Sequence, residues 1–132
     1  VLRFNEAALK EFRLDRRSGQ VGGTTVVFDK NYNALYFSKE LIPFFNEKHI
    51  KQREQSPVFH HVGVYAYSPE TLLNYNLWKE SNLEVLEGLE QLRFLENACS
   101  IKCVMVDSRG RTFWELNNPE DIVRIEKVIN KN

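Results

Sequence analysis

The stretch TTVVFDKNYNALYFS, residues 24–38, decides the fold because two runs suited to β-strands flank a short polar turn. Residues 24–28 and 34–38 are rich in β-branched and aromatic side chains, which favour extended structure. Residues 29–33 contain one aspartate and two asparagines, whose short polar side chains suit a tight reversal of the chain. The pattern therefore predicts a β-hairpin.

A helix is predicted before this hairpin. Asn5 has the side chain of a good N-cap, and apolar residues recur on one face of the segment that starts at Glu6. The helix is expected to end before Gly22-Gly23, which indicates a flexible turn or linker. We therefore expect residues 1–25 to form an N-terminal segment made of a helix and a glycine linker.

The chain that follows the hairpin is predicted to form an irregular arm, then a strand and then a helix. Residues 40–57 are polar with a proline near each edge, so they are expected to form an irregular arm. Residues 62–67 are predicted to form a strand whose small residues allow a neighbouring backbone to approach closely. Ser68 and Pro69 then supply an N-cap and a first-turn proline, which predicts a helix start.

Three further elements complete the prediction. Apolar residues recur at helical spacing over residues 83–97, and residues 101–106 are predicted to form a mostly buried strand. Asn118-Pro119 is typical of a helix start, and the last helix is expected to run to about residue 129. The order β-β-arm-β-α-α-β-α predicts an α/β fold, too short for a complete doubly wound sheet.

Composition limits the classes of function. The 132 residues suit one domain, and 18 basic side chains balance 18 acidic ones, so neither nucleic acid nor an anionic membrane is the expected partner. The longest apolar runs fall far short of the ~20 residues that span a bilayer. Cys99 and Cys103 are too few for a disulfide scaffold, so we expect buried, reduced cysteines in a cytoplasmic protein.

Two groups of side chains are candidates for chemistry. His60 and His61 precede the predicted strand, and because adjacent strand residues point to opposite faces, at most one of them faces a given pocket. A surface or capping role is the alternative for each. Glu84, Glu87 and Glu90 form an acidic stripe, which by itself is usually solvated. For the acidic stretch 58–98 that contains it, the alternatives are a solvated helix face and an acidic functional site.

Four motifs in order carry a resemblance to a known family. They are VFDKNYNALYFS at 27–38 followed by Ile42-Pro43, HVGVYAY at 61–67, LEVLEGLEQLR at 83–93 and NPEDI at 118–122. Over residues 26–130 the chain resembles CMP-KDO synthetase, also called 3-deoxy-manno-octulosonate cytidylyltransferase. Residues 1–25 do not match this family.

The resemblance implies a fold and a reaction. The implied fold is a partial Rossmann-like nucleotidyltransferase sheet with a β-hairpin/arm subdomain, through which residues 26–57 would form a homodimer. Residues 26–132 would be the C-terminal sugar-binding and dimerisation part of the enzyme. With Mg²⁺, that enzyme converts CTP and KDO, an acid sugar of lipopolysaccharide, into CMP-KDO and pyrophosphate.

The resemblance also implies site residues. His61, Tyr65, Glu90 and Gln91 match positions that bind the sugar, and their side chains can exchange hydrogen bonds with sugar hydroxyls. Lys39 stands where the family usually has arginine, which keeps the charge but loses the bidentate geometry. For each of these residues a purely structural role is the alternative interpretation.

Two departures from the family divide the functional hypotheses. Asn117 occupies the position of a metal-binding aspartate, which implies an impaired Mg²⁺ site, and the family's glycine-containing phosphate loop is absent from the sequence. The first hypothesis is a C-terminal enzyme portion that is inactive without a nucleotide-binding half. The second is a non-catalytic relic or interaction module that kept the fold and the dimer surface.

Overall fold

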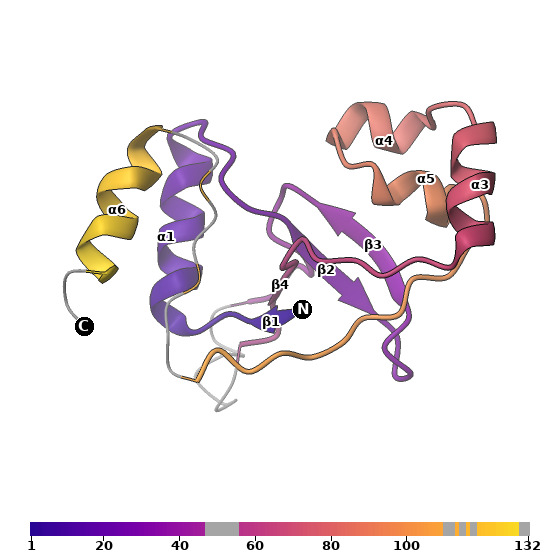
Figure 1. The fold of residues 1–132 in the computed structure, drawn as a ribbon. Coiled ribbons are helices and arrows are strands. Elements are labelled where there is room, and N and C mark those ends of the chain that lie inside the picture. The colour runs from indigo at the N-terminus through magenta and orange to yellow at the C-terminus, as the bar shows by residue number, and fades with distance from the viewer. Residues whose placement is uncertain (47–55, 110–112, 114–115, 117–118, 130–132) are drawn as a thin grey trace.

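A computed structural model describes residues 1–46, 56–109, 113, 116 and 119–129. Helices gather at both ends of the molecule, with a small sheet between them (Figure 1). The elements in chain order are β1 (Leu2–Arg3), α1 (Glu6–Arg17), β2 (Thr25–Phe28), β3 (Ala34–Ser38), β4 (Phe59–His60), α3 (Pro69–Leu77), α4 (Asn82–Glu87), α5 (Gln91–Glu96) and α6 (Pro119–Ile129).

The predicted hairpin is confirmed and forms one side of the sheet. β2 and β3 pair antiparallel from Thr25 opposite Ser38, with a register irregularity near the turn. In that turn the Asp29 carboxylate accepts the backbone N–H groups of Asn31 and Asn33, both at 2.8 Å. Such side-chain bonds to the local backbone stabilise a reversal, as the sequence predicted.

The sheet has the strand order β1-β4-β2-β3, and every ladder among the described residues is antiparallel. The mixed α/β class is therefore confirmed. The Rossmann-like sheet implied by the resemblance stays a prediction.

The N-terminal segment packs onto the sheet. Asn5 caps α1 by accepting the Ala8 N–H at 2.8 Å, which confirms the predicted helix start. The Arg16 guanidinium donates to the carbonyls of Gln20 and Gly23 and also to that of Lys39 beyond β3. The predicted glycine linker is thus held against the hairpin.

Two predicted strands are wrong. Residues 61–68, all of them described, have no regular secondary structure, and the strand of this region is β4, which ends at His60. In the segment 101–106 only Lys102 forms a β-bridge, with Asn33. Segment 101–106 meets the start of β3 through single contacts, such as the Ala34 N–H that donates to the Ile101 carbonyl at 2.8 Å, and among the described residues neither segment forms a ladder.

The helical predictions need one correction. The predicted helix over 83–97 is two short helices, α4 and α5, because Gly88 adopts the left-handed conformation with φ of 62° and ends α4. The predicted start at Ser68-Pro69 is confirmed, and Ser68 accepts the Thr71 N–H. Helix α6 begins at Pro119, and the predicted cap Asn118 lies outside the described residues.

The core lies where α5 packs on the hairpin. Its fully enclosed side chains include Val26, Phe37 and Leu92, with Leu89 and Cys103 beside them. Burial of these apolar side chains attaches the α4–α5 pair to β3.

Candidate functional site

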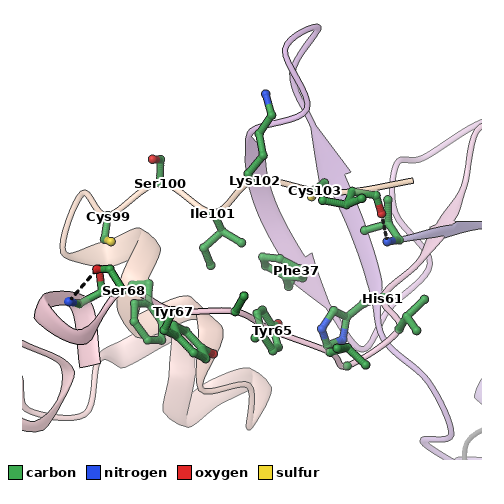
Figure 2. Close-up of a pocket in the computed structure, with 18 of the residues that line it drawn as sticks. Phe37, His61, Tyr65, Tyr67, Ser68, Cys99, Ser100, Ile101, Lys102 and Cys103 are labelled. Carbon is green, nitrogen blue, oxygen red and sulfur yellow. Dashed lines mark hydrogen bonds between the residues drawn. The ribbon is translucent and has the colours of Figure 1, made fainter. Parts of the chain in front are cut away.

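A cavity of about 630 Å³ opens between residues 61–68 and residues 99–106. Figure 2 shows Phe37 between these two segments, with His61 and Tyr65 on the segment that precedes α3. Phe94 and Tyr67 line the cavity at its other end, and their rings stack with centroids 5.2 Å apart. The wall is mostly aromatic and aliphatic with a few polar atoms, which is typical of a small-molecule site.

His61 and Tyr65 meet in this cavity. Their rings lie 5.2 Å apart, and the His61 ring also contacts Phe37 edge-on at 5.4 Å. The His61 backbone N–H donates to the Thr24 carbonyl at 2.9 Å, and this bond fixes the backbone from which the imidazole extends. The structure therefore brings together two of the predicted sugar-site residues.

Tyr65 carries a buried hydroxyl that has no hydrogen-bond partner among the described residues. Burial, with the nearby Tyr67 and Glu90, raises the pKa of Tyr65 far above its ordinary value. The phenol is therefore neutral at physiological pH and can still donate and accept a hydrogen bond. A buried polar atom of this kind is most stable with a partner, which a bound hydroxylated ligand could provide.

His60 points elsewhere, as predicted for adjacent residues. It is 8% exposed and packs between Phe4 and Phe113, at centroid distances of 5.3 and 5.0 Å. Only His61 of the pair lines the cavity.

The other predicted site residues lie around the turn between α4 and α5. Glu90 is exposed, and its charge raises the pKa of both Tyr65 and Tyr67, where burial is the larger cause. Gln91 is 1% exposed, and its Nε2 atom has no hydrogen-bond partner among the described residues. Lys39 extends its ammonium to Gly88 in the same turn. None of these three side chains lines the cavity itself.

The interpretation of the acidic stripe as one solvated face is wrong for two of its three members. Glu84 is 8% exposed and forms a two-bonded ion pair with Arg93, with both N–O distances 2.6 Å. This hydrogen-bonded pairing lowers the pKa of Glu84. Glu87 accepts hydrogen bonds from the end of β3, and only Glu90 faces solvent.

Sequence reasoning missed the role of Glu87. Its carboxylate accepts the Ser38 hydroxyl at 2.7 Å and the Lys39 N–H at 2.9 Å, across 49 and 48 residues of sequence. No local pattern signals a contact over such a separation. The signal available was the isolated glycine that follows Glu87, which indicates a break in the helix.

The two cysteines are free. Cys103 is buried, which confirms its prediction, and burial raises the pKa of its thiol. Cys99 is half-buried at the cavity wall, so its predicted burial is only partial.

The residues described here include no group of three or more His, Cys, Asp or Glu side chains arranged for a metal ion. Asn117, the predicted metal position, lies outside the described residues. Mg²⁺ binding at that position stays a prediction.

Comparison with known proteins assigns the family. The model of the family described as "Cytidylyltransferase" matches residues 19–103. The chain belongs to the cytidylyltransferase family. The match begins inside the segment 1–25 that was expected not to match the family, just after α1 ends at Arg17.

Individual relatives agree with this assignment. A 3-deoxy-manno-octulosonate cytidylyltransferase from Maricaulis maris is 44% identical over 117 residues, covering 89% of this chain and 44% of the relative. One from Chlorobium limicola is 41% identical over 108 residues, covering 80% of this chain and 40% of the relative. An 8-amino-3,8-dideoxy-manno-octulosonate cytidylyltransferase from a Shewanella strain is 40% identical over 102 residues, covering 77% and 38%.

A solved structure shares the fold. It is CMP:2-keto-3-deoxy-manno-octonic acid synthetase complexed with CTP, with a TM-score of 0.68 and 25% identity, covering 98% of this chain and 47% of that chain. This cytidylyltransferase chain thus spans less than half the length of the relatives it matches. Among its described helices, none is long and apolar enough to cross a membrane.

Proposed function

We propose that this chain provides the sugar-binding portion of a CMP-KDO synthetase, which transfers CMP from CTP to KDO and releases pyrophosphate. The observation that carries the proposal is the 44% identity with a 3-deoxy-manno-octulosonate cytidylyltransferase over 89% of the chain. The meeting of His61 and Tyr65 in one cavity supports it, since both were expected at the sugar site.

The proposed site has the donors and acceptors that a sugar needs. The neutral Tyr65 phenol and the His61 imidazole can bond to sugar hydroxyls, and the apolar wall can cover the carbon skeleton. Glu90 and Gln91 would add acceptors and donors from the start of α5. The role of these residues is to bind and orient the hydroxyl that attacks the α-phosphate of CTP.

CTP binding requires a part of the enzyme that the sequence of this chain does not provide. No glycine-rich phosphate loop occurs in the sequence, and a triphosphate needs a cradle of donors to be oriented for transfer. We infer that a nucleotide-binding portion completes the site. The Mg²⁺ ligand expected at Asn117 stays a prediction.

The first test is binding of KDO to the chain, measured by titration calorimetry. We expect saturable binding to the wild type and at least tenfold weaker binding to Tyr65→Phe, which loses the buried hydroxyl but keeps the ring. Tyr32→Phe, in the exposed hairpin turn, is the matched control and should bind like the wild type. Absence of KDO binding would contradict the proposal and favour the interaction-module hypothesis.

The second test is pyrophosphate release from CTP and KDO. The chain alone should release none above a no-protein control. Addition of the nucleotide-binding portion of a homologous synthetase, in trans or as a fusion, should produce activity that Tyr65→Phe reduces. Turnover by the chain alone would contradict the inference that a second portion is needed.

The homodimer through residues 26–57 is a separate proposal. β3 lies at the edge of the sheet, and Leu35 on it and Phe44 beyond it are 61% and 95% exposed. An exposed strand edge with apolar side chains favours pairing with a second copy. Sedimentation should show a dimer at micromolar concentration that Leu35→Lys weakens and Leu73→Lys, on α3, does not. A monomeric wild type would refute the dimer.

A further inference from the structure

The carboxylate of Glu87 joins the last residue of α4 to the end of β3. Its Oε1 atom accepts the Ser38 hydroxyl at 2.7 Å and the Tyr36 hydroxyl at 3.3 Å. Its Oε2 atom accepts the backbone N–H of Lys39 at 2.9 Å. One side chain thus accepts hydrogen bonds from three donors at the end of β3. Two of these donors belong to Ser38 and Lys39, where the chain leaves the sheet.

This contact fixes the backbone from which the Lys39 side chain extends. Ser38 is 3% exposed, and the Glu40 N–H donates to its hydroxyl at 2.9 Å. The Arg16 guanidinium donates to the Lys39 carbonyl from the other side. Because both peptide groups of Lys39 are held, the freedom of its ammonium comes only from its side-chain torsions.

Gly88 provides the space for that ammonium. A Cβ atom built on Gly88 would lie 2.7 Å from Lys39 Nζ, closer than any ordinary contact. The φ of 62° is what favours glycine at this position, whereas an added Cβ atom would displace the ammonium at the flexible end of the Lys39 side chain. Glu90 and Gln91 follow two and three residues later in the same turn.

Lysine needs such support more than arginine does. An ammonium is a point charge on a flexible four-carbon stem, whereas a guanidinium is a rigid fork that can hold a carboxylate with two parallel bonds. Since Lys39 stands where the resemblance implies arginine, its orientation has to come from its surroundings.

We propose that Glu87 and Gly88 are positioning residues that hold the Lys39 ammonium beside Glu90 and Gln91, where it pairs with an anionic group of the acid sugar. Glu87 holds the backbone of Lys39, and Gly88 leaves space for the Lys39 ammonium. The inference rests on the proposed function for the identity of the ligand.

The experiment separates the space at Gly88 from its backbone conformation. Gly88→Asn keeps a residue type that tolerates positive φ but adds a Cβ atom against Lys39 Nζ. Gly19→Asn is the matched control, because Gly19 has φ of 76° with nothing within 4 Å of its Cβ position. We expect Gly88→Asn to weaken KDO binding at least tenfold, and Gly19→Asn to stay within twofold of the wild type.

A double-mutant cycle then connects the effect to Lys39. Lys39→Met should weaken KDO binding by a similar factor, and Gly88→Asn should cause no further loss in the Lys39→Met background. Glu87→Gln, which keeps the size of the side chain, should weaken binding about fivefold, and this loss should also disappear in that background. If Gly88 and Glu87 had a purely structural role, the fold-losses in KDO affinity of the single variants would multiply in the double variants.

The outcomes are distinguishable. If the wild type binds no KDO, the proposed function is overturned and this inference with it. If the wild type binds KDO and Gly88→Asn binds equally well, or if its loss persists without Lys39, only the positioning role is overturned. The Lys39 ¹³Cε resonance of the free protein should also move in Gly88→Asn and not in Gly19→Asn, which a structural role at Gly88 does not require.

Discussion

The β2–β3 hairpin and the segments 61–67 and 101–106 all contain residues that favour β-strands, yet the exposure of their apolar side chains differs. In the hairpin, Val26 and Phe37 are 0% and 1% exposed. In the two segments, Val64 and Val104 are 86% and 68% exposed. The hairpin strands have each other and β4 as ladder partners, whereas the two segments border the cavity without a ladder.

The difference teaches that β-propensity alone does not bury a side chain. A strand satisfies its backbone groups only when a second strand lies alongside it, and the ladder then orients alternate side chains toward a core. The hairpin obtains its partner through a turn of five residues. The two segments contact the rest of the chain through single backbone hydrogen bonds, such as those of His61 to Thr24 and of Ala34 to Ile101, and they line the cavity that contains His61 and Tyr65.

The largest expected effect tests the hairpin side of this comparison. Phe37→Ala should lower the free energy of unfolding by about 3–5 kcal/mol, since it removes a core side chain that is 1% exposed and leaves a cavity in its place. Leu35→Ala on the same strand is the control, because its side chain is 61% exposed, and should change stability by less than about 0.5 kcal/mol. Urea denaturation measures both, and similar losses would show that the core is misassigned.

A smaller effect is expected where α4 and α5 are joined by the Glu84–Arg93 pair. Glu84→Gln keeps an acceptor for the helix cap but removes the charge that Arg93 faces, and we expect Tm at pH 7 to fall by roughly 5 °C. This loss should be smaller than that of Phe37→Ala, which identifies the hairpin core as the stronger determinant of stability.

The pH dependence of the same variant gives a second readout. Arg93 holds the folded-state pKa of Glu84 below its ordinary value of 4.5. The pair therefore stabilises the fold fully above about pH 4.5, and its contribution is lost as the pH falls through the folded-state pKa. The Tm difference between wild type and Glu84→Gln should shrink as the pH drops below 4.5. A constant difference would mean that the charge of Glu84 is not what stabilises the contact.

Features specified by neighbouring residues could be predicted from the sequence. The hairpin, the Asn5 and Ser68 caps and the start of the last helix near Pro119 all depend on residues within a few positions of one another. The division of roles between His60 and His61 followed from strand geometry in the same way.

Features that depend on tertiary partners could not be predicted. The strands expected at 62–67 and 101–106 needed ladder partners that propensity does not reveal. The acidic stripe was interpreted from spacing alone, but Glu84 forms an ion pair with Arg93 and Glu87 accepts a hydrogen bond from Ser38 at the end of β3. The site residues came from family resemblance, and only the structure shows that two of them share a cavity.

The smallest expected effect tests the other side of the comparison. Val104→Ala should change the free energy of unfolding by less than about 0.5 kcal/mol, since most of the side chain is already in water. The same substitution at Val26 should cost roughly 2 kcal/mol, because both lost methyl groups are fully buried. The chemical change is identical, so the ratio reports only the environment. Equal losses at Val26 and Val104 would mean that the exposed Val104 side chain packs against another surface in solution. A loss at Val104 that disappears on dilution would identify that surface as a second copy of the chain.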